Sequence, residues 1–236
     1  MPFFDQHILL AIIALPMVGA VVIMATPSAR DGAIRGTATA FGLVVLLLSF
    51  YVFTRYYFDG DGARFDSTWR WLSIPGPWKF GDIGISLTLG VDGVAAPMVL
   101  LTGIVMFTGV LVSWSIKSWN KDFFILYFLL LAGVFGVFAS YDLFFFFFFY
   151  ELSVLPMYLL IGVWGSSSQF PKFSRTKEYS AMKLTLYLVA GSVLIWVALM
   201  AIFVEANLGT FDIRRLAGCG RFTHGRRTDM WRRRLR

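Results

Sequence analysis

Six stretches of the chain are apolar over enough consecutive residues to cross a lipid bilayer: residues 8–26, 37–54, 93–114, 123–139, 143–164 and 180–204. A spanning helix needs roughly 17–25 predominantly apolar residues, because each residue adds about 1.5 Å. Lipid cannot satisfy open backbone polar groups, so we expect each stretch to be a helix. The pattern predicts an all-α polytopic membrane protein with about six transmembrane helices.

Residues 55–92, between the second and third stretches, carry a different pattern. Apolar residues alternate with small or polar ones at Ile83, Ile85, Leu87, Leu89 and Val91. This period of two is typical of a half-buried strand. Trp69 and Trp71 precede it, and IPGP at 74–77 supplies turn residues. We expect a short external β-hairpin-like loop with its tryptophans at the membrane interface, and the alternative is a plain linker.

The composition agrees with a membrane protein, since 58% of the residues are hydrophobic and the mean hydropathy is +0.71. The net charge of +7 comes from residues 214–236, which hold nine arginines and one aspartate and leave the rest of the chain at −1. We therefore expect the lipid bilayer as a partner and no nucleic acid. We divide the chain into a transmembrane region, 1–213, and a basic tail, 214–236. The tail is expected to be disordered, and it is either a natural extension or the non-native product of a frameshift near Gly218.

The short connections differ in basic content, which predicts the orientation. Lysine and arginine occur in the connections at 27–36, 115–122 and 165–179, whereas none precedes the first span or lies in the 140–142 turn. Basic loops favour the cytoplasm, so the N-terminus is expected outside it. Metal and disulfide chemistry are not indicated, because Cys219 is the single cysteine and His7 and His224 lie in opposite terminal regions.

The fifth stretch contains a carboxylate in apolar surroundings. Glu151, one of three glutamates, follows six phenylalanines and a tyrosine in FFFFFFYELSVLPMY at 144–158. An ionised carboxylate about 12 Å into a hydrocarbon core is costly, so such residues face a bundle interior, water or a partner. Pro156 frees the carbonyl of Leu152, next to Glu151, for a water molecule. We interpret Glu151 as a candidate proton relay, and the alternative is a neutral acid hydrogen-bonded to a neighbouring helix.

The sixth stretch contains Lys183 near its start. In antiparallel packing about 13 Å along the axis separates it from Glu151, which is too far for a direct ion pair. A water-bridged charge relay is one hypothesis for Lys183, and snorkelling to the cytoplasmic headgroups is the other.

Three sequence blocks occur together in one order: LGVDG at 89–93 leading into PMVLLTGIV, ELSVLPMYLLIGVWG at 151–165 after the Phe-rich run, and EYSAMKLTLYLVAGSVL at 178–194. They resemble the chain M family of respiratory complex I, the antiporter-like proton-pumping subunits of NADH:quinone oxidoreductase, over residues 1–213. The resemblance implies a membrane-arm subunit of a bacterial inner membrane that takes part in proton translocation coupled to electron transport. Glu151 would be the family's key glutamate, and Lys183 matches a family lysine.

The resemblance also implies that this chain has no redox centre of its own. NADH, FMN, iron–sulfur clusters and quinone would be held by other subunits, and the partners would be other membrane-arm subunits of complex I. The sequence departs from the family at Tyr150, where tryptophan is usual, and it lacks the later spans, so we expect an N-terminal portion of such a subunit. Two alternatives are a subunit of a monovalent cation/proton antiporter, which shares the helical core, and an inactive membrane-inserted remnant.

Overall fold

The computed structural model describes residues 2–27, 31–59, 65–74, 83–116, 119–170, 173–206 and 208–217. Within these ranges six helices are long and apolar enough to cross a membrane. They are α1 (Pro2–Ala25), α2 (Asp31–Asp59), α3 (Ala95–Val112), α4 (Asn120–Ala139), α5 (Leu143–Trp164) and α6 (Lys177–Ala206). Each corresponds to one of the predicted stretches, so the prediction of an all-α polytopic membrane protein is confirmed.

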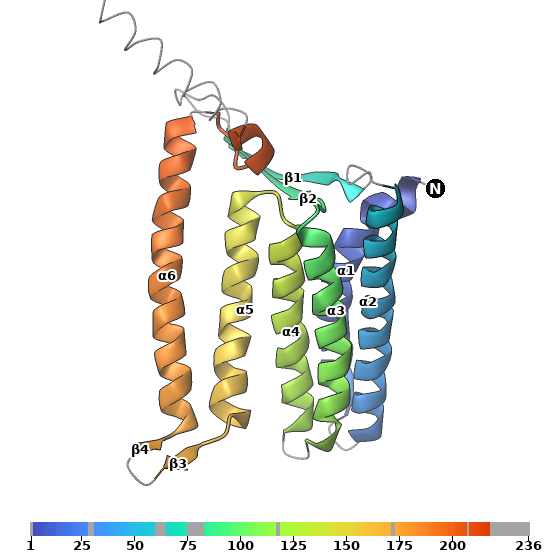
Figure 1. Cartoon of the computed structure of the whole chain (residues 1–236), viewed down its shortest axis with the longest axis vertical. Helices are drawn as coiled ribbons and strands as arrows, with labels where there is room; N and C mark the ends of the chain where they lie inside the picture. The colour runs from blue at the N-terminus through green and yellow to red at the C-terminus, as the bar shows by residue number, and fades with distance from the viewer. Residues whose placement is uncertain are drawn as a thin grey trace, which may run out of the picture.

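The helices run side by side, with α6 at one edge of the bundle next to α5 (Figure 1). Helix α4 is central, because it packs against α5, α1 and α3. The main core contains large side chains that are almost completely buried, among them Ile8, Leu9, Met106, Phe124, Phe128 and Phe135. In contrast, α6 exposes apolar side chains such as Leu194 and Val197 on the side away from α5.

Two glycines allow α4 and α5 to approach closely. A Cβ atom at Gly133 would lie 2.9 Å from the carbonyl oxygen of Phe149, and one at Gly136 would overlap the ring of the same residue. Small residues at such positions are typical of closely packed membrane helices. This contact fixes the rotation of α5, and with it the direction in which Glu151 points.

A two-stranded antiparallel sheet covers one end of the bundle, which we call the hairpin end (Figure 1). Strands β1 (Ser67–Ile74) and β2 (Ile83–Leu89) pair from Ser67↔Leu89 to Ile74↔Ile83. The predicted β-hairpin is therefore confirmed. Two backbone hydrogen bonds fasten it to the α4–α5 turn, from Gly90 N to Ala139 O at 2.9 Å and from Tyr141 N to Thr88 O at 2.8 Å.

Two smaller elements were not predicted from the sequence. A 3₁₀ turn, η2 (Ser113–Ser115), follows α3, and a second hairpin, β3 (Ser168–Phe170) with β4 (Phe173–Arg175), joins α5 to α6 at the other end of the bundle. Strands of three residues are too short to show a period in the sequence.

The segment after α6 returns over the hairpin end. Ile213 N donates to Tyr141 O at 2.9 Å, and Leu143 N donates to Phe211 O at 3.0 Å. Residues 213–217 form a helical turn, so the division that we expected after residue 213 falls inside a structured segment. Residues 218–236, with Gly218, Cys219 and His224, lie outside the described residues, and the hypotheses on disorder and frameshift remain predictions.

Candidate functional site

Glu151 lies in α5, whose two ends are held by specific contacts. The Asp142 side chain caps the N-terminus by accepting from Phe144 N at 2.9 Å and Phe145 N at 3.2 Å. At the C-terminus, the Nζ of Lys177 donates to Val163 O at 2.6 Å, which satisfies one of the last carbonyls and places a positive charge at the negative end of the helix. The helix that carries Glu151 is thus fixed from both sides.

The Glu151 side chain is half-buried, and its Oε1 atom has no hydrogen-bond partner within the described residues. A buried carboxyl oxygen without a partner is costly in protein, and this cost is met by protonation, water or a further polar group. The relay role of Glu151 and the alternative of a neutral structural acid remain predictions.

Glu151 is on the face of α5 that is turned toward α6. Phe147, one turn earlier, packs against Trp196 with ring centroids 4.9 Å apart. Gly162, about three turns later, lies where a Cβ would be 3.8 Å from Ala181 Cβ. Residues separated by whole turns share a helix face, so Glu151 faces α6 as Phe147 and Gly162 do.

The same two contacts define which residue of α6 lies at the level of Glu151. Phe147 is as many residues from Gly162 as Ala181 is from Trp196, so one antiparallel register accounts for both contacts. In that register Ser192 lies at the level of Glu151. Ser192 is buried, with 4% of its surface exposed, and its Oγ donates to Val189 O at 2.9 Å.

We did not predict Ser192 as a site residue. The available signal is modest: Gly191 and Ser192 interrupt an apolar run in α6. That signal becomes meaningful only after the register of the two helices is known.

One turn before Pro156, α5 carries a hydrogen bond from a side chain to its own backbone. Ser153 Oγ donates to Tyr150 O at 2.7 Å, next to Glu151. The carbonyl that Pro156 leaves without a backbone donor is that of Leu152, so the Ser153 bond does not replace the missing one. Pro156 itself is buried within α5.

Lys183 does not lie near Glu151. Nine residues of α6 separate it from Ser192, which corresponds to about 13 Å along the axis and about half a turn around it. Its side chain is exposed, and its Nζ lies 5.8 Å from the ring centroid of Tyr187. No ion pair joins Lys183 to Glu151 in the described part of the chain. Its relay role and the snorkelling alternative remain predictions.

Asp142 is a second carboxylate on α5 that we treated only as part of a turn. It is 0% exposed, and its Oδ2 has no hydrogen-bond partner among the described residues. Burial raises the pKa of Asp142 to about 6, opposed by the backbone N–H groups of Phe145 and Phe144. The signal that could have identified it is an aspartate immediately before an apolar helix.

Metal-ligating side chains do not gather in the part of the chain that the structure describes. Within the described ranges no three His, Cys, Asp or Glu side chains cluster in a way that could hold an ion. His7 packs against Trp69 with ring centroids 5.8 Å apart.

Comparison with known proteins identifies similar chains. Residues 140–232 match the family described as "NADH:quinone oxidoreductase/Mrp antiporter, TM". The chain is 32% identical over 209 residues to NAD(P)H-quinone oxidoreductase chain 4-2 of Synechocystis, covering 88% of this chain and 34% of that protein. It is 31% identical over 231 residues to NADH-ubiquinone oxidoreductase chain 4 of Marchantia polymorpha, covering 98% and 43%. The chain thus spans about a third to two fifths of the length of these relatives.

A solved structure supports the fold. The chain superposes on respiratory complex I from Thermus thermophilus with a TM-score of 0.67 at 20% identity, covering 88% of this chain and 38% of that one. The family match extends to residue 232, so our expectation that the resemblance ends at residue 213 was wrong.

Proposed function

We propose that this chain belongs to the antiporter-like membrane subunits of the NADH:quinone oxidoreductase/Mrp antiporter family. On that premise, it takes part in proton translocation coupled to electron transport. The observation that supports this is the buried Oε1 of Glu151, which lacks a partner among the described residues in a helix long enough to span a membrane. A carboxyl group there can take up a proton and release it to water, whereas the surrounding apolar side chains cannot.

Aromatic residues near Glu151 pack on both faces of α5. Phe147 packs against Trp196 on one side, and Phe149 packs against Gly136 on the other. Phe149 lies on the face of α5 opposite Glu151, so only the Phe147–Trp196 contact borders the carboxyl group. We propose that a proton reaches Glu151 along a path of water and hydroxyl groups. The Ser192 hydroxyl, at the level of Glu151, offers a hydrogen-bond partner for such a path.

The redox cofactors that drive the proposed proton translocation would come from other subunits. We propose that the chain packs with other membrane-arm subunits, and that NADH, FMN, iron–sulfur clusters and quinone are held elsewhere in the assembly. The exposed apolar side of α6 supports this, because Tyr187, Leu194 and Val197 are each at least 60% exposed there.

The protein is an integral membrane protein, and we propose a bacterial inner membrane with the N-terminus outside the cytoplasm. The basic connections support this orientation. A cysteine placed at the exposed Ser166, in a Cys219→Ser background, should react with a charged maleimide from the cytoplasmic side. Reaction only from the outer side would show that the orientation is opposite to the one proposed.

A monovalent cation/proton antiporter subunit is the second candidate, because the matched family description names both kinds of protein. An affinity tag on the chain distinguishes the two: co-purification of NADH-oxidising subunits supports the first. An inactive remnant would co-purify neither with NADH-oxidising subunits nor with antiporter subunits.

The test of the proposed function is substitution of Glu151 in membranes that contain the assembled complex. Glu151→Gln keeps the shape but removes the exchangeable acid, so proton pumping driven by NADH should fall steeply while assembly survives. Glu151→Asp should retain part of the pumping, and Glu205→Gln, at the exposed end of α6, is the matched control. Full pumping by the assembled Gln variant would contradict the relay.

A further inference from the structure

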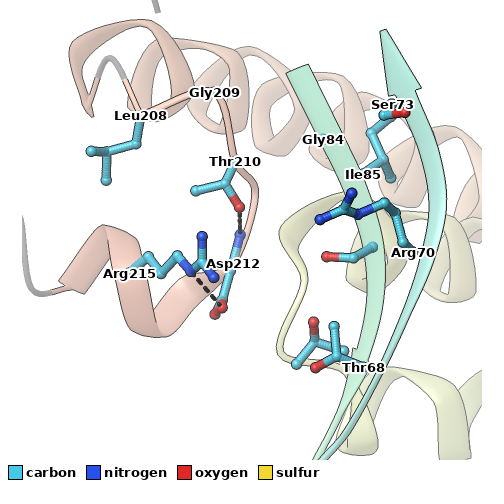
Figure 2. A pocket seen from close by; sticks show the side chains of 12 residues that line it. Thr68, Arg70, Ser73, Gly84, Ile85, Leu208, Gly209, Thr210, Asp212 and Arg215 are labelled. Atoms are coloured by element: carbon cyan, nitrogen blue, oxygen red, sulfur yellow. Dashed lines mark hydrogen bonds and ion pairs between the residues drawn. The ribbon is translucent and has the colours of Figure 1, made fainter. Parts of the chain in front are cut away.

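A polar cavity of about 540 Å³ lies between the β1–β2 hairpin and the segment after α6 (Figure 2). Its volume is in the range of small-molecule sites, roughly 300–1,000 Å³. The polar residues that line it include Thr68, Arg70, Thr88, Thr210, Asp212 and Arg215. None of them belongs to the α5–α6 pair that carries Glu151 and Ser192.

The cavity has an excess of positive charge. Two arginines and one carboxylate line it, and Figure 2 shows Arg70 on the strand wall opposite Arg215 and Asp212. The Asp212 carboxylate is already engaged, because its Oδ1 accepts from Arg214 N at 2.9 Å and its Oδ2 lies 3.7 Å from Arg215 Nε. Arg70 makes no hydrogen bond or ion pair in the described part of the chain. Two guanidinium groups on opposite walls favour an anion between them.

A neutral donor points to the same kind of ligand. Thr88 lines the cavity and is 4% exposed, and its Oγ1 has no hydrogen-bond partner within the described ranges. A buried hydroxyl without a partner is costly, and an oxyanion in the cavity would accept its hydrogen bond. Arginine forks and hydroxyl groups together are the usual donors to phosphate.

The surroundings favour a lipid as the source of that phosphate. Trp71 is 63% exposed and lies against Phe144, with ring centroids 6.0 Å apart, and tryptophan is enriched at membrane interfaces. Leu208 lines the cavity and is 45% exposed, and Val204 near the end of α6 is 63% exposed. These apolar surfaces can receive acyl chains while the headgroup enters the cavity.

We propose that this cavity binds a phosphate group between Arg70 and Arg215, with the Thr88 hydroxyl as a further donor, supplied by an anionic phospholipid or by free phosphate. The proposal is independent of proton translocation by Glu151. It assigns the arginine of β1 and the first part of the basic tail to ligand binding.

Binding is measured on the purified full chain in detergent by native mass spectrometry, with dioleoylphosphatidylglycerol as the lipid probe. Arg70→Gln should weaken lipid binding about tenfold, as expected for the loss of a charged hydrogen bond. Arg215→Gln should weaken lipid binding similarly. Thr88→Val, which removes the donating hydroxyl, should also weaken it. Lys121→Gln, at the other end of the bundle, removes the same charge and should leave binding unchanged.

A second arm titrates inorganic phosphate by calorimetry and as a competitor of the lipid. Lipid binding without phosphate binding identifies the headgroup as the source, and phosphate binding that displaces the lipid identifies free phosphate. The proposal is overturned if the wild type binds neither probe, or if Arg70→Gln and Arg215→Gln bind both probes as the wild type does. Circular dichroism checks that each variant is helical. If Arg70→Gln fails to fold, Arg215→Gln alone tests the proposal, because the Arg215 side chain is 74% exposed and its replacement should not disturb folding.

Discussion

The guanidinium group of Arg214 binds both carboxylate oxygens of Asp66, with Nη1 to Oδ2 and Nη2 to Oδ1 each at 2.6 Å. It also lies over the ring of Tyr141, 4.0 Å from the centroid. The hydrogen bonds with Asp66 raise the pKa of Arg214 above its ordinary value. One side chain therefore joins the loop before β1, the α4–α5 turn and the segment after α6.

Replacing Arg214 should loosen the segment after α6. In Arg214→Gln the bidentate ion pair is lost, while the backbone hydrogen bonds from Ile213 to Tyr141 and from Leu143 to Phe211 remain. A largely exposed ion pair contributes about 1 kcal/mol or less. We expect backbone amide exchange of residues 209–213 to become up to about fivefold faster, measured by hydrogen–deuterium exchange with mass spectrometry.

Arg215→Gln is the matched control for this prediction. Arg215 is 74% exposed at its side chain and its Nε lies 3.7 Å from Asp212 Oδ2, so its loss should change exchange little. Equal acceleration in both variants would show that net charge, and not the Asp66 contact, holds the segment.

Asp142 should make the stability of the protein depend on pH. Burial raises its pKa from 3.8 to about 6, so folding favours the protonated form. The contribution of Asp142 to stability is therefore fully present below about pH 4 and is lost as the pH rises through about 6. The thermal midpoint of the wild type, followed by circular dichroism in detergent, should contain a component that falls over this window.

Asp142→Asn should remove that component while it keeps an acceptor for the N-terminus of α5, and Asp142→Ala should also lose the cap, at a cost of about 1 kcal/mol. Asp122→Asn, an exposed residue in the first turn of α4, is the control. An unchanged pH slope in the Asn variant would mean that another group produces it.

Hydropathy predicted much of this fold for a physical reason. Lipid forces each long apolar stretch to satisfy its own backbone, so α5 could be predicted to begin at Leu143 and end at Trp164, as it does. Outside the membrane this constraint is absent, and the three-residue strands β3 and β4 were missed. The strand at Ile83–Leu89 was predicted because one of its faces is covered and the alternation remains visible.

The candidate site was only partly predictable. Glu151 is conspicuous in the sequence because a carboxylate in an apolar run is rare, but the residue at its level depends on the register of α5 and α6. Lys183 has the charge that a relay needs, yet its position on α6 turns its side chain away from Glu151. Lys177, near the start of the same helix, looked like a loop charge and instead donates to the Val163 carbonyl.

Gly136 should be intolerant of any side chain. A Cβ there would overlap the Phe149 ring, so Gly136→Ala must separate α4 from α5 or turn the ring. We expect a destabilisation of about 1–3 kcal/mol, measured as a lower midpoint in denaturant. Gly191→Ala is the control, because nothing lies within 4 Å of its added Cβ. A neutral Gly136→Ala variant would indicate that the two helices are more loosely packed than this contact implies.

Ser192 should assist the proton exchange of Glu151 without replacing it. Ser192→Ala removes a buried hydroxyl at the level of the carboxyl group, so pumping in the assembled complex should fall severalfold, less than in Glu151→Gln. The pH profile of the remaining activity should shift, because a hydroxyl that can pass on a proton is no longer present at the level of Glu151, and Ser192→Thr should restore the wild-type profile. Thr185→Ala, which removes a hydroxyl that donates to Ala181 O at 3.0 Å on the same helix, should leave both readouts unchanged. A purely structural role for Ser192 would lower the amount of assembled complex and leave the pH profile where it was, and that result would remove Ser192 from the proton path.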